Sequence, residues 1–339
     1  MMKASIFLVC LFFVLNASNF CMREKELTDV EFYNLLGTEY FKGKPFKLVE
    51  TECSDVRDNS TCLYIIDRIG YFPDGEWFVG RFVTPVPNLN KGFLSVSKLT
   101  KPTFKSKSTI DTSIWPVDIG MMDVLTPNGV EFSFLFSTGQ FPLNRDITGD
   151  VLLIGVATGG LMSYIGHYFK NLNLVGVDID PNSEYLAKKW FGYVDRSRSK
   201  ILIDDGAEYI KKMAERGETS NAVLVDACHN NEPTDNLYCP VAAVRTPRFL
   251  SDLSKVIGKR GFSAFNTYHK MNWKKGYEEM RDSFRKHFEK CELIDADKLI
   301  SNMFLICANH DWEQNEVDQT EVQQFLNKFR LQPFLQYLV

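Results

Sequence analysis

The chain has no excess of basic residues and, after its first 15 positions, no long apolar run. Its 339 residues include 39 Lys and Arg against 43 Asp and Glu, a formal net charge of -4. This balance argues against general nucleic-acid binding, which favours basic surfaces. Internal repeats and low-complexity tracts are also missing. A hydrophobic content of 45% is ordinary for a globular protein, and the length suggests about two domains.

The N-terminal segment, residues 1–20, differs from the rest of the chain. Met1-Met2-Lys3 provides a positive start, Ile6–Leu15 is unbroken apolar sequence, and small residues suited to cleavage follow at 16–19. A helix over the apolar part would reach about 15 Å, well short of the roughly 30 Å hydrocarbon core. A cleaved signal peptide at 1–20 is therefore favoured over a membrane anchor or a buried N-terminal element. This predicts a protein that is secreted or lies in the lumen of the endoplasmic reticulum or Golgi.

Cysteine usage also fits an oxidising compartment. Three pairs lie close enough in the sequence for local disulfides: Cys53–Cys62, Cys228–Cys239 and Cys291–Cys307. Cys10 should leave with the signal peptide, so Cys21 is the one left over, and spacing alone does not fix the connectivity. The close Cys and His groupings of a zinc site are missing, so no metal is expected. The sequon Asn59-Ser60-Thr61 lies between two of these cysteines and predicts an exposed, glycosylated lumenal loop.

Residues 22–145 are interpreted as an N-terminal β-rich domain. Lys47–Thr51 and Leu63–Ile69 alternate as strands do, and Pro and Gly interrupt the region at short intervals. A helix is expected before these strands, from about Arg23 to Leu36. The change of character at Asn144–Gly149 predicts the domain boundary, with a cofactor-binding domain over the remaining residues.

Near the end of this β-rich region the sequence carries a hairpin signal. Thr126-Pro127-Asn128-Gly129 contains the residues of a tight turn. Apolar segments precede it at 121–125 and follow it at 130–136. The pattern predicts two antiparallel strands joined by this turn.

The following domain, residues 146–339, alternates between strand and helix patterns. Strands are predicted at five places, each followed by a helix: 151–154, 174–177, 200–203, 222–225 and 262–266. Asn182 is expected to cap the helix after the second of them. Two last strands, at 293–294 and 303–308, are too close for a helical crossover and should pair antiparallel. The sequence predicts an α/β fold with a doubly wound, mostly parallel, seven-stranded Rossmann-like sheet.

The first predicted βαβ unit contains a glycine-rich turn. Gly155-Val156-Ala157-Thr158-Gly159-Gly160 follows an apolar strand, and Asp178 ends the next strand 23 positions after Gly155. That spacing is close to the one at which an acid reaches the ribose hydroxyls of a bound nucleoside. Strand, turn, helix, strand and terminal carboxylate together predict a nucleoside-binding site.

Three acids follow predicted strands: Asp178, Asp205 and Asp226. Ligands bind at the carboxyl ends of strands in open α/β sheets, and a dinucleotide fold needs only the first of these acids. S-adenosylmethionine, or its decarboxylated form, has no phosphate and carries a sulfonium, so it favours acids and a close-packed turn. A sulfonium nucleoside is therefore preferred to NAD. Each acid alone could instead cap a helix or stabilise a turn.

The segments VLLIGVATGG, VGVDIDP, LAKKWFG, ILIDDGAEYI, AVLVDA and Cys239-Pro240 give the chain a family resemblance. Over roughly residues 150–310 it resembles the class I methyltransferases of spermidine-synthase type, and among them the C-terminal domain of the methyltransferase-like 13 proteins. The resemblance implies S-adenosyl-L-methionine as cofactor. It also implies the following cofactor-binding residues: Gly155, Ala157 and Gly159 in the turn, Asp178 at the ribose, Ile179, Asp205 and Gly206 at the adenine, and Asp226 at the methionyl amine and reaction centre.

The departures from this family bear on activity. Polyamine synthases have a second catalytic aspartate three residues after the position of Asp226, where this chain has His229. Their upstream tyrosine- and acid-containing substrate motif finds no match either, which disfavours aminopropyl transfer. Methyl transfer needs mainly positioning and one base, and His229 could be that base. It could equally be an exposed loop residue, as Asn230, Asn231 and Glu232 could be, whereas His167 and His269 are expected on a helix face and at a strand end.

The function predicted from the sequence is that of a secretory S-adenosylmethionine-dependent methyltransferase-like protein with Asp226 and His229 at its catalytic centre. The expected partners are the cofactor, a protein or small amine acceptor, and a second copy of the chain in a homodimer. Neither nucleic acid nor, after signal cleavage, a membrane is expected. Three alternatives stay open: a non-catalytic secreted protein that keeps the fold, an aminopropyltransferase and, least favoured, a nicotinamide oxidoreductase.

Overall fold

The computed structural model describes these parts of the chain: residues 24–54, 62–87, 93–229, 233–234, 236–271, 274–296, 302–312 and 317–337. The expected signal peptide, Cys21 and the sequon at 59–61 lie outside them. The described residues of 45–101 and 115–337 pack as one compact unit, and residues 24–44 form a second unit with 102–114. The boundary expected at Asn144–Gly149 follows sequence character rather than packing and stays a prediction.

The described part of the smaller unit contains one short helix, α2 (Asp29–Leu35), continued by a π-helical turn, η1 (Leu36–Tyr40). Thr28 caps α2 by accepting a hydrogen bond from the backbone N–H of Glu31, whose side chain accepts in return from the N–H of Thr28. This reciprocal pair satisfies two otherwise unpaired donors, so the helix begins at Asp29, later than the sequence pattern predicts. Two 3-10 turns complete the unit: η2 (Lys107–Thr109) and η3 (Thr112–Ile114).

An antiparallel sheet opens the larger unit, as the alternating sequence predicts. Its strands, in spatial order, are β1 (Phe46–Cys53), β2 (Cys62–Tyr71), β3 (Trp77–Thr84) and β4 (Ser95–Lys98). Cys53 and Cys62 face each other in the register of β1 and β2 and form a disulfide. Between β2 and β3, Asp67 accepts two hydrogen bonds of 2.8 Å from the guanidinium of Arg81, and both side chains are buried.

The central sheet has the doubly wound topology that the sequence predicts. Its order is β12-β13-β11-β9-β6-β7-β8, and β10 pairs with β11 beside this path. The parallel strands are β6 (Gly149–Ile154), β7 (Leu172–Asp178), β8 (Ser199–Ile203), β9 (Ala222–Val225) and β11 (Phe262–His269). The antiparallel strands are β10 (Leu237–Cys239), β12 (Lys290–Asp295) and β13 (Met303–Ala308). Cys291 and Cys307 are register partners and form a disulfide.

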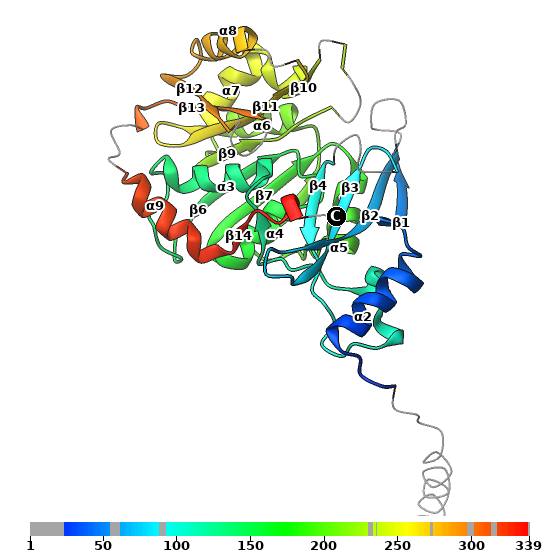
Figure 1. The fold of residues 1–339 in the computed structure, drawn as a ribbon. Coiled ribbons are helices and arrows are strands. Elements are labelled where there is room, and N and C mark those ends of the chain that lie inside the picture. Colours follow the sequence, from blue (N-terminus) through cyan, green and yellow to red (C-terminus); the bar gives the residue numbers. More distant parts are fainter. Residues whose placement is uncertain are drawn as a thin grey trace, which may run out of the picture. The chain divides into compact units, whose positions relative to one another are not determined.

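Helices cover both faces of this sheet (Figure 1). They are α3 (Pro127–Ser137), α4 (Gly160–Tyr168), α5 (Pro181–Trp190), α6 (Gly206–Arg216), α7 (Pro247–Ile257), α8 (Lys274–Phe284) and α9 (Gln319–Leu326). Strand β6 alternates between the two cores: Val151 and Leu153 pack with α3, α4 and α9, whereas Leu152 and Ile154 pack with α6 and α7. None of the described helices combines the length and apolar character needed to cross a membrane.

The predicted hairpin at 121–136 is wrong. Strand β5 comprises only Met122–Asp123, and the expected second strand is the buried helix α3. Thr126 is the N-cap of that helix, where its side chain accepts from the N–H of Gly129, and Pro127 takes the first helical position. Thr-Pro before a helix and a hairpin turn use the same residue types, because both need a fixed φ and a side-chain acceptor.

The helix after β7 also begins two residues earlier than predicted. Its N-cap is Asp180, whose Oδ1 accepts a hydrogen bond of 2.9 Å from the N–H of Asn182. Asn182 is therefore not the cap. Pro181 sits at the first helical position, where its missing N–H costs nothing.

The C-terminal segment pairs with strand β5. After α9 and the 3-10 turn η6 (Asn327–Phe329), strand β14 (Leu331–Gln332) pairs in parallel with β5. The carboxylate of Asp123 accepts from the N–H of Leu335 at 2.5 Å, just before a last turn, η7 (Leu335–Tyr337). This attachment places Leu335 and Gln336 in the wall of the cavity described next.

Candidate functional site

The glycine-rich turn after β6 has a left-handed backbone at three positions. The φ angles are 86° at Gly155, 50° at Ala157 and 65° at Gly159. A Cβ at Gly155 would lie 2.4 Å from the carbonyl oxygen of Asp226, so the turn lies directly against the end of β9. Only glycine fits the first position, whereas Ala157 adopts a conformation that costs a residue with a Cβ about 1 to 2 kcal/mol.

Asp178, at the end of β7, holds this turn. Its Oδ2 accepts from the N–H of Val156 at 2.8 Å and of Ala157 at 3.0 Å, and its Oδ1 accepts from the N–H of Asp180 at 2.9 Å. Burial raises the pKa of Asp178, and the backbone N–H groups oppose that rise. The carboxylate thus joins the turn to the end of the neighbouring strand.

Asp205 follows β8 and is the N-cap of α6. Its Oδ1 accepts from the N–H groups of Ala207 at 2.8 Å and Glu208 at 3.0 Å. Asp205 therefore caps a helix, which was one of the alternatives that the sequence left open. It also lines the cavity, next to Gly206. Ile179 lines the same space with 56% of its surface exposed, so its apolar side chain is accessible to a ligand in the cavity.

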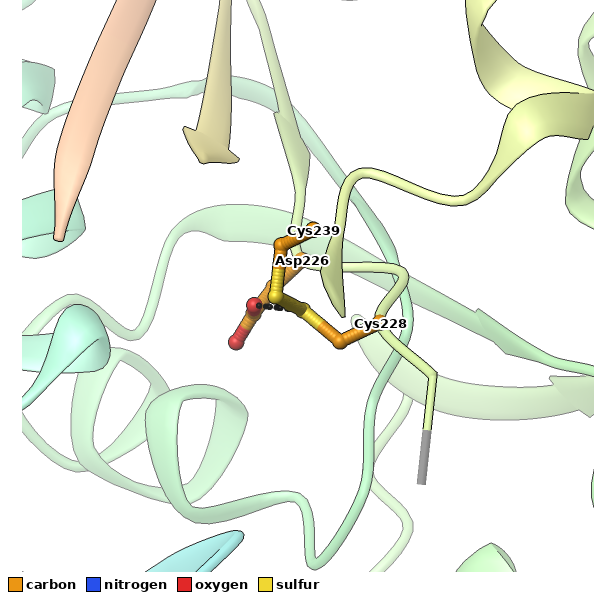
Figure 2. A group of neighbouring side chains, drawn as sticks. All are labelled: Asp226, Cys228 and Cys239. Atoms are coloured by element: carbon orange, nitrogen blue, oxygen red, sulfur yellow. Dashed lines mark hydrogen bonds between the residues drawn. A yellow bond between two sulfur atoms is a disulfide. The ribbon is translucent and has the colours of Figure 1, made fainter. Parts of the chain in front are cut away.

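Asp226, at the end of β9, lies beside a disulfide (Figure 2). Its Oδ1 accepts a hydrogen bond of 2.6 Å from the side-chain amide of Asn266 and lies 3.2 Å from Sγ of Cys228. That sulfur is bonded to Cys239 and carries no hydrogen, so the second contact is not a hydrogen bond. For the same reason these three residues, although their ligand atoms lie within 4.8 Å, offer no thiolates to a metal.

The acids converge on one cavity of about 1370 Å³ at the carboxyl ends of the central strands. Asp178, Asp205 and Asp226 all line it. Burial raises the pKa of Asp226, and the charge of Asp178 raises it further. His229 and Lys270 are the only basic residues in the cavity wall within the described ranges. The site therefore favours a ligand with positive charge over one with phosphates.

The other sequence candidates are distributed as follows. Ala157 lines the large cavity, while Gly159 lines only a small side chamber, where a Cβ would approach Ala187 to 3.1 Å. His167 lies on α4 beside Tyr168 and His269 ends β11, both outside the cavity wall. Asn230, Asn231 and Glu232 lie outside the described residues.

Two residues of this site were not predicted. Asn266 orients Asp226, and its position near the end of the fifth predicted parallel strand was a signal that could have found it. Glu131 on α3 is 1% exposed and lines the side chamber together with Asp226. Nothing in the sequence pointed to Glu131, because the hairpin prediction placed it on a strand.

Comparison with known proteins connects this geometry to a fold family. No protein-family model matches the chain. A segment of 116 residues is 28% identical to the eEF1A lysine and N-terminal methyltransferase of Xenopus laevis, and it makes up 34% of this chain and 17% of that protein. The matched segment thus spans less than a fifth of the length of this relative.

Solved structures resemble more of the chain. Human methyltransferase-like protein 13, solved in complex with SAH, superposes with a TM-score of 0.52 at 21% identity, over 62% of this chain and 92% of its own. Spermidine synthase from Thermotoga maritima superposes with a TM-score of 0.52 at 13% identity, over 86% of this chain and 84% of its own. The central sheet and its helices have the class I methyltransferase fold, which spermidine synthases share.

Proposed function

We propose that the protein is an S-adenosylmethionine-dependent methyltransferase of the secretory pathway, with a protein or small amine as acceptor. The observation that carries this proposal is the convergence of Asp178, Asp205 and Asp226 on one cavity beside the glycine turn. Among the described residues of the cavity wall, the acids have no cluster of basic residues around them, which suits a sulfonium nucleoside better than a phosphate-bearing cofactor. The similarity to the Xenopus methyltransferase supports the same reading.

The cofactor fits the residues present. Asp178 would accept from the ribose hydroxyls, a role that its position at the end of β7 allows. Ile179 would pack against the adenine, whose edge Asp205 and Gly206 would contact. Asp226 would lie near the methionyl amine and the reacting sulfonium.

The chain's contribution to chemistry would be positioning and proton removal. S-adenosylmethionine, when bound, supplies a methyl group activated by a positively charged sulfur. The cavity wall has to hold the acceptor atom in line with that methyl group, and this alignment provides most of the catalysis. His229 lines the cavity and would accept the proton that an amine acceptor loses.

The secretory location rests on the apolar segment at 6–15 and on the disulfides. The structure forms all three predicted pairs, Cys53–Cys62, Cys228–Cys239 and Cys291–Cys307. Disulfides of this kind persist in oxidising compartments and are rare in the cytosol. The Cys228–Cys239 disulfide lies against Asp226, so the proposed reaction centre contains a bond that persists in an oxidising compartment.

Direct binding tests the proposal against its rivals. Calorimetric titration of the purified protein with S-adenosylmethionine should release or absorb heat and saturate at one site. Binding of decarboxylated S-adenosylmethionine alone would favour an aminopropyltransferase, and binding of NAD alone would favour an oxidoreductase. No heat with any of the three would support a non-catalytic protein that kept the fold.

Replacing His229 with alanine should lower turnover about 100-fold, the typical contribution of a general base, and leave cofactor affinity unchanged. Turnover can be measured as transfer of labelled methyl groups from S-adenosylmethionine to the proteins and small amines of a secretory extract. His287→Ala is the matched control, because His287 lies outside the cavity wall. Full activity in His229→Ala would mean that His229 is a loop residue and not the catalytic base.

A further inference from the structure

Glu131 is a buried acid whose carboxylate has an unpaired oxygen atom. It lies on α3 with 1% of its surface exposed, and its Oε1 has no hydrogen-bond partner among the described residues. A buried polar atom left unpaired costs about 1 to 3 kcal/mol, and more when it is charged. Such an atom is rare in a folded protein and calls for an explanation.

The acid lines a small chamber beside the glycine turn. The chamber measures about 20 Å³, space for one water molecule or one ammonium group. Gly155, Ala157 and Asp226 line both this chamber and the large cavity, so the two spaces adjoin. A ligand in the large cavity could therefore extend one small group into the chamber.

The electrostatics of the chamber favour a cation. Within the described ranges, the chamber wall contains the two acids Glu131 and Asp226 and no basic residue. Burial raises the pKa of Glu131 strongly, and the charge of Asp226 raises it further. A positive group would relieve this repulsion and satisfy the unpaired oxygen.

We propose that Glu131 binds the ammonium group of the cofactor's amino-acid tail in this chamber. The inference rests on the proposed function, since it requires a sulfonium nucleoside in the large cavity. Helix α3 then contributes a cofactor ligand to a site otherwise built from strand ends. Glu131 is a binding residue in this scheme, and Asp226 stays near the reacting centre.

Three ligands distinguish binding of the amino-acid tail from binding of the nucleoside. They are S-adenosylmethionine, its decarboxylated form, which keeps the amine, and 5′-methylthioadenosine, which lacks the tail. In Glu131→Gln, calorimetric affinity for the first two should fall about 10- to 100-fold, the range of a hydrogen bond to a charged group. Affinity for 5′-methylthioadenosine should not change. Glu215→Gln, at an exposed acid on α6, should bind all three ligands as the wild type does.

A purely structural role for Glu131 predicts another result, in which the variant unfolds more easily and binds all three ligands with equal loss. If Glu131→Gln fails to fold, Glu131→Met, which removes the buried polar group, provides the same comparison. Equal affinity for S-adenosylmethionine in wild type and variant would overturn the proposed role of Glu131 but leave the proposed function of the protein intact. If the wild type binds none of the three ligands, the proposed function falls and this inference with it.

Discussion

The Asp178→Ala protein should not bind S-adenosylmethionine measurably, with affinity at least 100-fold below that of the wild type. In the proposed complex the carboxylate contacts the ribose, and hydrogen bonds to a charged group contribute about 1.5 to 3 kcal/mol each. The same carboxylate also accepts from the N–H groups of Val156 and Ala157. Its removal therefore takes away a ligand contact and loosens the turn. Calorimetric titration measures the loss.

Asp204→Ala provides the matched control for this change. Asp204 follows the same strand as Asp205, but it pairs with Lys212 at 2.8 Å and lies outside the cavity wall. An exposed ion pair of this kind contributes at most about 1 kcal/mol, so binding should persist. Wild-type affinity in Asp178→Ala, with the control unchanged, would contradict a nucleoside site at this turn.

The strands, the glycine turn and its acids were predictable because each has a local cause. Parallel strands buried on both faces are continuous apolar runs, and β6 and β9 show this in 151–154 and 222–225. Acids placed directly after such runs must meet at one edge of the sheet, as Asp178 and Asp226 do. Local pairing also explains the disulfides, since Cys291 and Cys307 lie on adjacent antiparallel strands.

The helix α3 and its acid were not predictable in the same way. Residues 130–136 read as a strand because apolar residues dominate them, and periodicity cannot separate a short buried helix from a buried strand. Burial on most sides removes the polar face that would have revealed the helix. Glu131 is the one acid in the segment and lines a chamber beside the turn after β6. Its place in the site follows from the tertiary structure and could not be predicted from local sequence.

A disulfide lies beside Asp226, the residue proposed to lie near the reacting sulfonium. The disulfide between Cys228 and Cys239 joins the residues just after β9 to strand β10 and places sulfur against the carboxylate (Figure 2). His229 follows directly, and its N–H donates to the carbonyl of Tyr238 at 2.8 Å. The loop that would carry the base is thus held by a covalent bond that an oxidising compartment maintains.

Replacing Gly155 with alanine should both destabilise the protein and abolish cofactor binding. The new Cβ would lie 2.4 Å from the carbonyl oxygen of Asp226 and 3.0 Å from the nitrogen of Ala227, and backbone atoms cannot move aside as a flexible side chain can. Overpacking costs about 1 to 3 kcal/mol, and a left-handed φ costs alanine about 1 to 2 kcal/mol more. Urea unfolding should therefore show a loss of about 2 to 5 kcal/mol.

Gly217→Ala separates the two causes. Gly217 has a φ of 68° at the C-cap of α6, and a Cβ there would meet nothing within 4 Å. That variant should lose only about 1 kcal/mol, because alanine's smaller entropy in the unfolded chain offsets part of the φ cost. It should also bind S-adenosylmethionine normally. Equal losses in the two variants would mean that φ alone matters, and that the turn does not lie against β9 as closely as the cavity requires.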